Sequence, residues 1–76
     1  MKNITVFTKD GCVSCKMTKE TLKQLGIEFT ERNINHDETA IQELISQGFQ
    51  TVPLVMVDGV PKIAVFRPDK LKELTA

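Results

Sequence analysis

Apolar residues fall along the first third of the chain in a pattern that predicts a strand and then a helix. Residues 2–8 place Ile4, Val6 and Phe7 among β-branched threonines, which favours a strand with much of its surface buried. After a polar break at residues 10–11, apolar residues recur at roughly helical spacing, up to a glycine that would cap the helix. These residues are Val13, Met17, Leu22 and Leu25, and the glycine is Gly26.

A second strand and a second helix are predicted next. Apolar residues mark a strand over residues 27–34, and a polar cluster closes it. Asn35 followed by Glu38 has the spacing of a capping box, although Asp37 is an equally good N-cap. The helix that starts there should end at Gly48 and bury one stripe. That stripe consists of Ala40, Ile41, Leu44 and Ile45.

The last third of the chain predicts a hairpin and a short helix. The run VPLVMV at residues 52–57 is typical of a strand buried on both faces. Asp-Gly at residues 58–59 is a strong hairpin signal, so residues 61–66 should return antiparallel. Pro68 is well placed as the first residue of a last helix. The apolar residues of that helix are Leu71 and Leu74.

The predicted order β-α-β-α-β-β-α indicates an α/β fold, a four-stranded mixed sheet with three helices on its faces. A crossover helix makes the first two strands parallel, and the final hairpin adds an antiparallel pair. We expect a single domain over residues 1–76, since the chain shows no repeat, linker or low-complexity segment. Met17 and Met56 are both expected to fill the core.

Composition and charge exclude several classes of function. Ten basic residues offset ten acidic ones, and this balance argues against a nucleic-acid or membrane-surface binder held by long-range attraction. The apolar run near the N-terminus is too short for a signal peptide or a membrane span. We therefore expect a cytoplasmic protein, in a compartment where cysteines are kept reduced.

Cys12 and Cys15 are the residues with the most distinctive chemistry. Cys12 lies where the first strand ends and the helix begins, so backbone N–H groups and the positive end of the helix dipole favour its thiolate. Cys15 lies one helical turn further on, within reach of Cys12, and should be the more buried. Attack by Cys12 on a partner's disulfide would give a mixed disulfide, which Cys15 would resolve by releasing the reduced partner.

Other uses of the two cysteines are possible. They could be small buried hydrophobes, but such residues have no reason to lie at a strand–helix junction. A structural zinc site needs about four ligands, and the chain adds only a distant His36, predicted to be solvated, and carboxylates. A carrier of a soft metal or an iron–sulfur cluster is the alternative from another class. Copper-carrying domains with this motif run β-α-β-β-α-β, however, and usually have methionine before the pair.

Thr51, Val52 and Pro53 lead into the predicted third strand. Proline cannot donate a hydrogen bond to the sheet, so a proline that opens a strand beside a redox pair suggests a cis peptide bond. A cis bond between Val52 and Pro53 would expose the Val52 backbone for pairing with an extended partner segment. Phe49 is expected to pack under the site.

These motifs together resemble the thioredoxin-fold family, in particular the NrdH-redoxins of its glutaredoxin-like branch. The resemblance covers essentially the whole chain. C-x-x-C alone is weak evidence, C-x-x-C with the later V-P is strong for the fold, and G-F with F-R-P-D indicates the branch. The motifs are V-F-T at 6–8, C-V-S-C at 12–15, G-F at 48–49, V-P at 52–53 and F-R-P-D at 66–69.

The resemblance implies a thiol-disulfide oxidoreductase that cycles Cys12 and Cys15 between dithiol and disulfide. Such a carrier takes electrons from thioredoxin reductase and donates them to a class Ib ribonucleotide reductase. It binds no cofactor, uses NADPH only indirectly through the reductase, and is expected to be a monomer. The alternative is a glutathione-dependent glutaredoxin. Those proteins typically show C-P-Y-C and a glycine-rich stretch with an acidic pair, where this chain has FRPDKL at residues 66–71.

The resemblance also assigns roles to single residues. Cys12 would be the nucleophile, Cys15 the resolving thiol, and Pro53 the cis-proline that faces them. Two departures concern the neighbourhood of the site: Gly11 replaces a residue that is often polar, and I-A-V at 63–65 stands where family members usually have Trp-Ser-Gly. The residues expected to contact the partner are Thr8, Thr51, Val52, Pro53 and Phe66.

Overall fold

The computed structural model describes residues 3–64 and 68–73 of the chain. Its elements follow the predicted order β-α-β-α-β-β-α. Within the described residues, none of the helices is long and apolar enough to cross a membrane. The elements are β1 (Ile4–Thr8), α1 (Val13–Gln24), β2 (Thr30–Asn33), α2 (Glu38–Ser46), β3 (Leu54–Val57), β4 (Val60–Ala64) and α3 (Pro68–Glu73).

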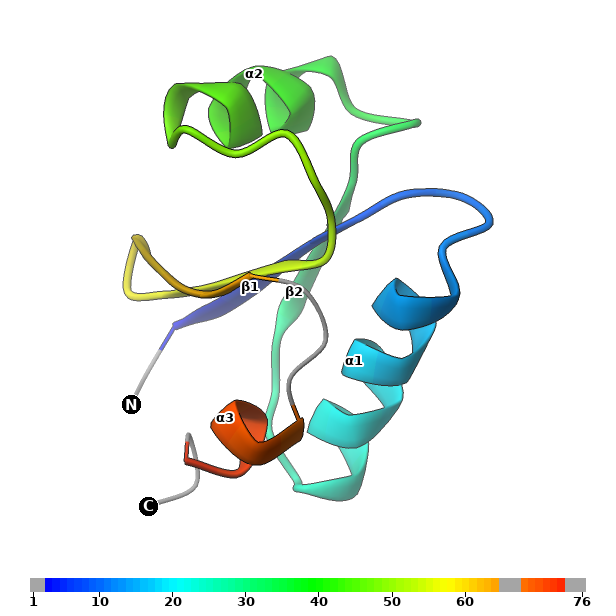
Figure 1. Ribbon diagram of the computed structural model, residues 1–76, viewed down its shortest axis with the longest axis vertical. Helices are drawn as coiled ribbons and strands as arrows, with labels where there is room; N and C mark the ends of the chain where they lie inside the picture. The colour runs from blue at the N-terminus through cyan, green and yellow to red at the C-terminus, as the bar shows by residue number, and fades with distance from the viewer. Residues whose placement is uncertain (1–2, 65–67, 74–76) are drawn as a thin grey trace.

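The strands form one mixed sheet in the order β2-β1-β3-β4. β1 runs parallel to β2 and antiparallel to β3, and β3 pairs antiparallel with β4. Figure 1 shows α1 and α3 on one side of the sheet and α2 on the other. The predicted four-stranded mixed sheet with three helices is confirmed.

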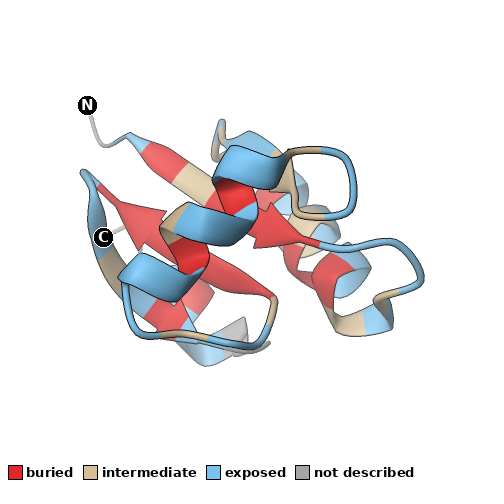
Figure 2. Ribbon diagram, turned by 90° about the horizontal axis from the view of Figure 1, so that it is seen from above, coloured by how far each residue is buried: buried red, intermediate tan, exposed pale blue. Residues whose placement is uncertain are grey.

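The two central strands, β1 and β3, divide the core into two parts, because successive side chains of a strand point to opposite faces. Every residue of β3 is buried, as predicted for a strand covered on both faces. Figure 2 shows the buried residues gathered on the strands between the helices. The buried cluster on the side of α1 and α3 contains Ile4, Val6, Leu22, Val55, Val57, Ile63 and Leu71, and the cluster on the side of α2 contains Phe7, Ala40, Leu44, Leu54 and Met56.

Two of the turns contain glycines at the positions where the sequence analysis expected a helix cap and a hairpin. Gly26 has a φ of 73°, and the N–H of Ile27 donates to the carbonyl oxygen of Leu22 at 2.9 Å, which is the Schellman pattern that ends α1. Asp58 and Gly59 have φ values of 52° and 81°, as a two-residue type I′ hairpin turn requires. The predicted helix cap and the predicted hairpin are both confirmed.

The predicted buried face of α1 is wrong in its first half. Val13 is 71% exposed and Met17 is 46% exposed, so Met17 does not fill the core, whereas Met56 does. At about 100° per residue, Leu22 lies roughly half a turn around the helix from Val13, and the two cannot share one face. The stripe that packs on the sheet is instead Cys15, Thr18 and Leu22.

The predicted stripe of α2 is also too wide. Ala40 and Leu44 are buried, but Ile41 is 37% exposed and Ile45 is 59% exposed. A short helix on one face of a small sheet buries only the residues that point directly at the strands. The N-cap is Asp37, whose side chain accepts hydrogen bonds from the backbone of Thr39 and Ala40, and not Asn35.

Three strand boundaries differ from the prediction. β2 begins at Thr30 and not at residue 27, because Ile27 belongs to the Schellman turn that ends α1. β3 begins at Leu54 and not at residue 52, directly after a proline that has no N–H to give to the sheet. β4 spans Val60–Ala64, and residues 65–66 of its predicted range, like Leu74 of the predicted last helix, lie outside the described residues.

Candidate functional site

The two cysteines form a disulfide at the start of α1. Cys12 is the N-cap of the helix, with extended backbone angles, and its Cα lies 5.2 Å from that of Cys15. The backbone N–H of Cys15 donates to the Cys12 sulfur at 3.2 Å, so this sulfur takes the place of the oxygen that usually caps a helix. After reduction, a negative charge on the Cys12 sulfur would face the same N–H group and the positive end of the helix.

The two sulfurs differ in how far solvent and partners can reach them. Cys15 is only 1% exposed and packs as part of the buried stripe of α1, as predicted. Cys12 is half-buried and lies beside an open groove. Of the two sulfurs, that of Cys12 is the one that a partner's sulfur can approach directly.

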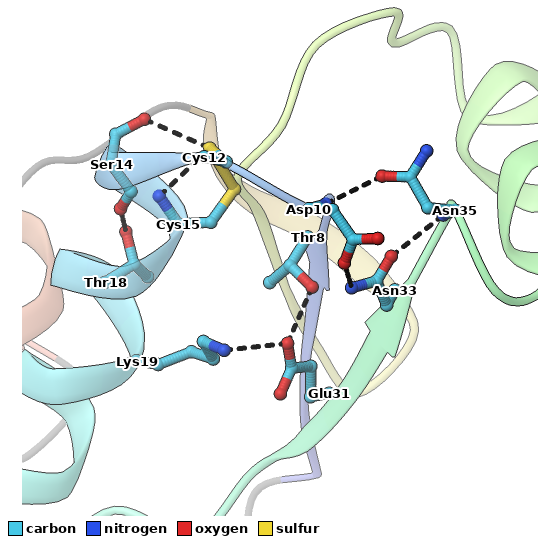
Figure 3. Close-up of a disulfide and its surroundings, with 10 residues drawn as sticks. All are labelled: Thr8, Asp10, Cys12, Ser14, Cys15, Thr18, Lys19, Glu31, Asn33 and Asn35. Atoms are coloured by element: carbon cyan, nitrogen blue, oxygen red, sulfur yellow. Dashed lines mark hydrogen bonds and ion pairs between the residues drawn. A yellow bond between two sulfur atoms is a disulfide. The ribbon is translucent and has the colours of Figure 1, made fainter.

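Ser14 and Thr18 support the turn that holds the pair, and the sequence analysis did not identify them. The Ser14 hydroxyl lies 3.5 Å from the Cys12 sulfur. The Thr18 hydroxyl, fully buried, donates to the carbonyl oxygen of Ser14 at 2.9 Å (Figure 3). Threonine commonly bonds the carbonyl four residues earlier in a helix, so the spacing of Ser14 and Thr18 was a usable signal.

A polar network ties the loop before Cys12 to the loop after β2. The backbone N–H of Asp10 donates to the Asn35 side chain at 2.7 Å, and the Asn33 amide donates to the Asp10 carboxylate at 3.0 Å (Figure 3). His36, exposed as predicted, places its Nε2 atom 3.0 Å from the same carboxylate. Asn35 thus anchors the loop before Cys12 and does not cap α2.

Thr8, Glu31 and Lys19 form a second network below the disulfide (Figure 3). Thr8 is 1% exposed at the end of β1, and its hydroxyl donates to Glu31 at 2.8 Å. Lys19 of α1 donates to the same carboxylate oxygen at 2.9 Å. The hydrogen bond from Lys19 lowers the pKa of Glu31, helped by Thr8 and opposed by partial burial. These partners are distant in the sequence, so spacing gave no sign of the network.

We expect Glu31→Gln to destabilise the protein at neutral pH and to have little effect in acid. Glu31 has a lowered pKa in the folded state, so its contribution is present above its ordinary value of 4.5 and is lost as the pH falls through the lowered value. The effect is small, since the ion pair is partly exposed. Urea unfolding midpoints of both proteins at neutral pH and in acid would measure it.

Glu28→Gln is the matched control, because Glu28 is exposed and the same carboxylate is lost. It should leave the midpoint unchanged at both pH values. If the urea midpoints of wild type and Glu31→Gln differed by as much in acid as at neutral pH, the charge of Glu31 would not be the cause of the difference.

The predicted partner-contact residues lie in different environments. The peptide bond between Val52 and Pro53 is cis, as predicted. Phe7 pairs with Leu54, so the antiparallel register continues Thr8 opposite Pro53, at the end of the sheet from which the loop to Cys12 departs. Pro53 is buried, Val52 is half-buried and packs with Phe49 on the α2 side, and Thr51 is exposed. Phe66 lies outside the described residues.

The described residues offer no evident metal site. Across residues 3–64 and 68–73, no group of three or more His, Cys, Asp or Glu side chains is placed to hold a metal ion.

Known proteins resemble this chain along almost its whole length. The sequence profile of the glutaredoxin family matches residues 4–61. The glutaredoxin-like protein NrdH of Lactococcus lactis subsp. cremoris is 34% identical over 71 residues, which are 93% of this chain and 97% of that protein. The NrdH protein of Salmonella typhimurium is 36% identical over 72 residues, or 95% of this chain and 88% of that protein.

A solved structure supports the same relation. The NrdH-redoxin of Escherichia coli superimposes with a TM-score of 0.85 and 32% sequence identity, over 95% of this chain and 93% of that one. It is described as a glutaredoxin-like protein with a thioredoxin-like activity profile. This likeness confirms the predicted thioredoxin fold.

Proposed function

The chain belongs to the glutaredoxin family and, within it, to the NrdH group of thiol-disulfide oxidoreductases, and from this premise we propose that it carries electrons from thioredoxin reductase to a class Ib ribonucleotide reductase. The main support from the site is the Cys12–Cys15 disulfide, with one sulfur beside an open groove and the other buried. NADPH enters only through the reductase, and the chain acts as a single-domain monomer in the cytoplasm.

Each turnover moves two electrons and two protons from the carrier to its client. The Cys12 thiolate attacks one sulfur of the client's disulfide, so a Cys12–client bond forms, the client's S–S bond breaks, and the released thiolate takes up a proton. Cys15 then loses its proton and attacks the Cys12 sulfur. The Cys12–Cys15 bond forms, the Cys12–client bond breaks, and the client's second sulfur leaves as a thiolate that takes up the second proton. The reductase returns both cysteines to thiols.

The remaining predicted residues would guide the partner to Cys12. The backbone of Val52, which is half-buried and lies two residues before β3, is the proposed pairing site for an extended client segment. Pro53 and Thr8 are buried at the same end of the sheet, so they would act by positioning the backbone there, whereas Thr51 is exposed and could contact the partner directly. Phe66, the remaining predicted contact residue, lies outside the described residues.

The choice of reductant rests on two observations. The Escherichia coli relative has a thioredoxin-like activity profile despite its glutaredoxin-like sequence. In this chain, residues 66–71 read FRPDKL, where glutathione-using glutaredoxins typically have a glycine-rich stretch with an acidic pair. Both observations favour a protein reductant over glutathione.

We expect NADPH and thioredoxin reductase to reduce the oxidised protein quickly, and glutathione with glutathione reductase to reduce it slowly. The measurement is the rate of NADPH consumption, followed by the loss of NADPH absorbance, with the two reducing systems run in parallel. Insulin or ribonucleotide reductase serves as the final electron acceptor. A glutaredoxin that uses glutathione serves as the matched control and should show the opposite preference.

Two outcomes would contradict the proposal. Reduction mainly by glutathione would make this protein a glutaredoxin in its activity as well as its family. Failure with both systems would favour the metal or iron–sulfur carrier, and metal analysis of the purified protein would then test that function.

A further inference from the structure

The outer face of α1 exposes apolar side chains directly beside the disulfide. Val13, which follows Cys12, is 71% exposed, and Met17 is 46% exposed. The two residues are four apart on a helix and therefore lie one above the other on the same face. That face points away from the buried stripe of α1. Packing of the core therefore does not explain why these two positions are apolar.

This apolar face is continuous with the groove beside the disulfide. A shallow hollow on α1 is lined by Val13, Lys16, Met17, Glu20 and Thr21, which we call the α1 surface. The groove beside the disulfide is lined by both cysteines and shares Val13, Lys16 and Glu20 with that hollow. A partner segment whose sulfur meets Cys12 can therefore extend onto the α1 surface without leaving the protein.

The charge around this surface is positive, although the chain as a whole is neutral. Lys9, Lys16 and Lys23 line the groove, and within the described part of the chain none of the three makes an ion pair. Of the acidic groups in the groove, Glu31 is paired with Lys19 and Asp10 lies against His36. With His36 neutral, the four lysines of the groove face the carboxylates of Asp10, Glu20 and Glu31, which leaves an excess of one positive charge.

We propose that the α1 surface docks an acidic segment of the client protein, with an apolar side chain of that segment resting on Val13 and Met17. The proposal rests on the proposed function, because it assumes that the substrates are disulfides of client proteins. It adds which kind of client segment the protein recognises. Carboxylates flanking the client's disulfide would meet Lys16 and the other lysines of the groove. Complementary charge of this kind acts mainly on the rate of association, and salt screens it.

Two synthetic peptides test the role of charge. Both carry the same internal disulfide with a leucine beside it, flanked by aspartates in one peptide and by lysines in the other. The dithiol form of the protein is mixed with each, and as the peptide disulfide becomes two thiols, Cys12 and Cys15 become a disulfide. At low ionic strength we expect the acidic peptide to react about tenfold faster, and this preference should shrink in high salt.

The variant Lys16→Glu should lower the ratio of the two rates severalfold. Because each variant is compared with itself on two peptides, any change in the reactivity of Cys12 cancels in the ratio. Lys62→Glu on β4 is the matched control, since it makes the same charge change outside the groove, and it should leave the ratio unchanged. Equal rates for the two peptides with the wild-type protein would overturn the proposal. So would an equal fall of the rate ratio in Lys16→Glu and Lys62→Glu.

A second pair of variants tests the apolar contact. Replacing the leucine of the acidic peptide with serine should slow the wild-type protein more than it slows Met17→Ser. Ile45→Ser is the matched control, because Ile45 is more exposed than Met17 but lies on α2. If Met17→Ser keeps the full preference for leucine, the apolar part of the docking site is wrong. The assay contains neither reductase, so the proposed electron route can fail without changing this result.

Discussion

Replacing Cys12 with serine is expected to abolish disulfide-reducing turnover, by roughly 10⁴-fold or more, as for the loss of other covalent nucleophiles. The reason is chemical, because a serine hydroxyl is not ionised at neutral pH and forms no stable bond to sulfur. The helix should survive the change. Cys12 is the N-cap of α1, and serine is among the residues preferred at that position. Turnover with insulin and unfolding by urea, measured on one preparation, would separate the two effects.

Cys15→Ser should fail at the next step and trap the client on Cys12. The first thiol exchange needs only Cys12, but the release of the client needs the sulfur that lies one turn further along α1. Mass spectrometry under non-reducing conditions should show the mixed disulfide as a covalent adduct. The double variant with both serines is the control and should form none. A Cys15→Ser protein with full turnover through thioredoxin reductase would contradict the two-thiol cycle.

The features that the sequence predicted well are those decided by neighbouring residues. The start of α1 next to Cys12 and the glycine that ends this helix each depend on a few consecutive residues and their allowed backbone angles. The Asp58–Gly59 turn is local in the same way, and it fixes the antiparallel register of β3 and β4. The order of elements followed from these signals and from the alternation of apolar residues.

The features that the sequence did not predict depend on where distant segments come to lie. Met17 is apolar, and only the orientation of α1 on the sheet shows that it points away from the core. Glu31 reaches Thr8 and Lys19 because β2 lies parallel to β1 and next to α1, which no spacing along the chain reveals. The exposed face of α1 was missed for the same reason, since it was counted as core.

Phe7→Ala should remove much of the stability of this protein. Phe7 is fully buried in the cluster on the α2 side of the sheet, and the Arg32 guanidinium lies 5.5 Å from the centre of its ring. Truncation of a buried phenylalanine to alanine lowers the free energy of unfolding by about 3–5 kcal/mol. A chain of 76 residues has only roughly 4–11 kcal/mol in total, at about 0.05–0.15 kcal/mol per residue.

Urea unfolding followed by far-UV circular dichroism would measure this loss. Val13→Ala is the control, because it also truncates an apolar side chain, but one that is 71% exposed, and it should change the free energy of unfolding by less than about 0.5 kcal/mol. The two variants are expected to differ in stability because the Phe7 side chain points into the core and the Val13 side chain points to solvent, although both side chains are hydrophobic. A loss below about 1 kcal/mol in Phe7→Ala would mean that Leu44, Leu54 and Met56 close the cavity, and that Phe7 does not hold α2 on the sheet.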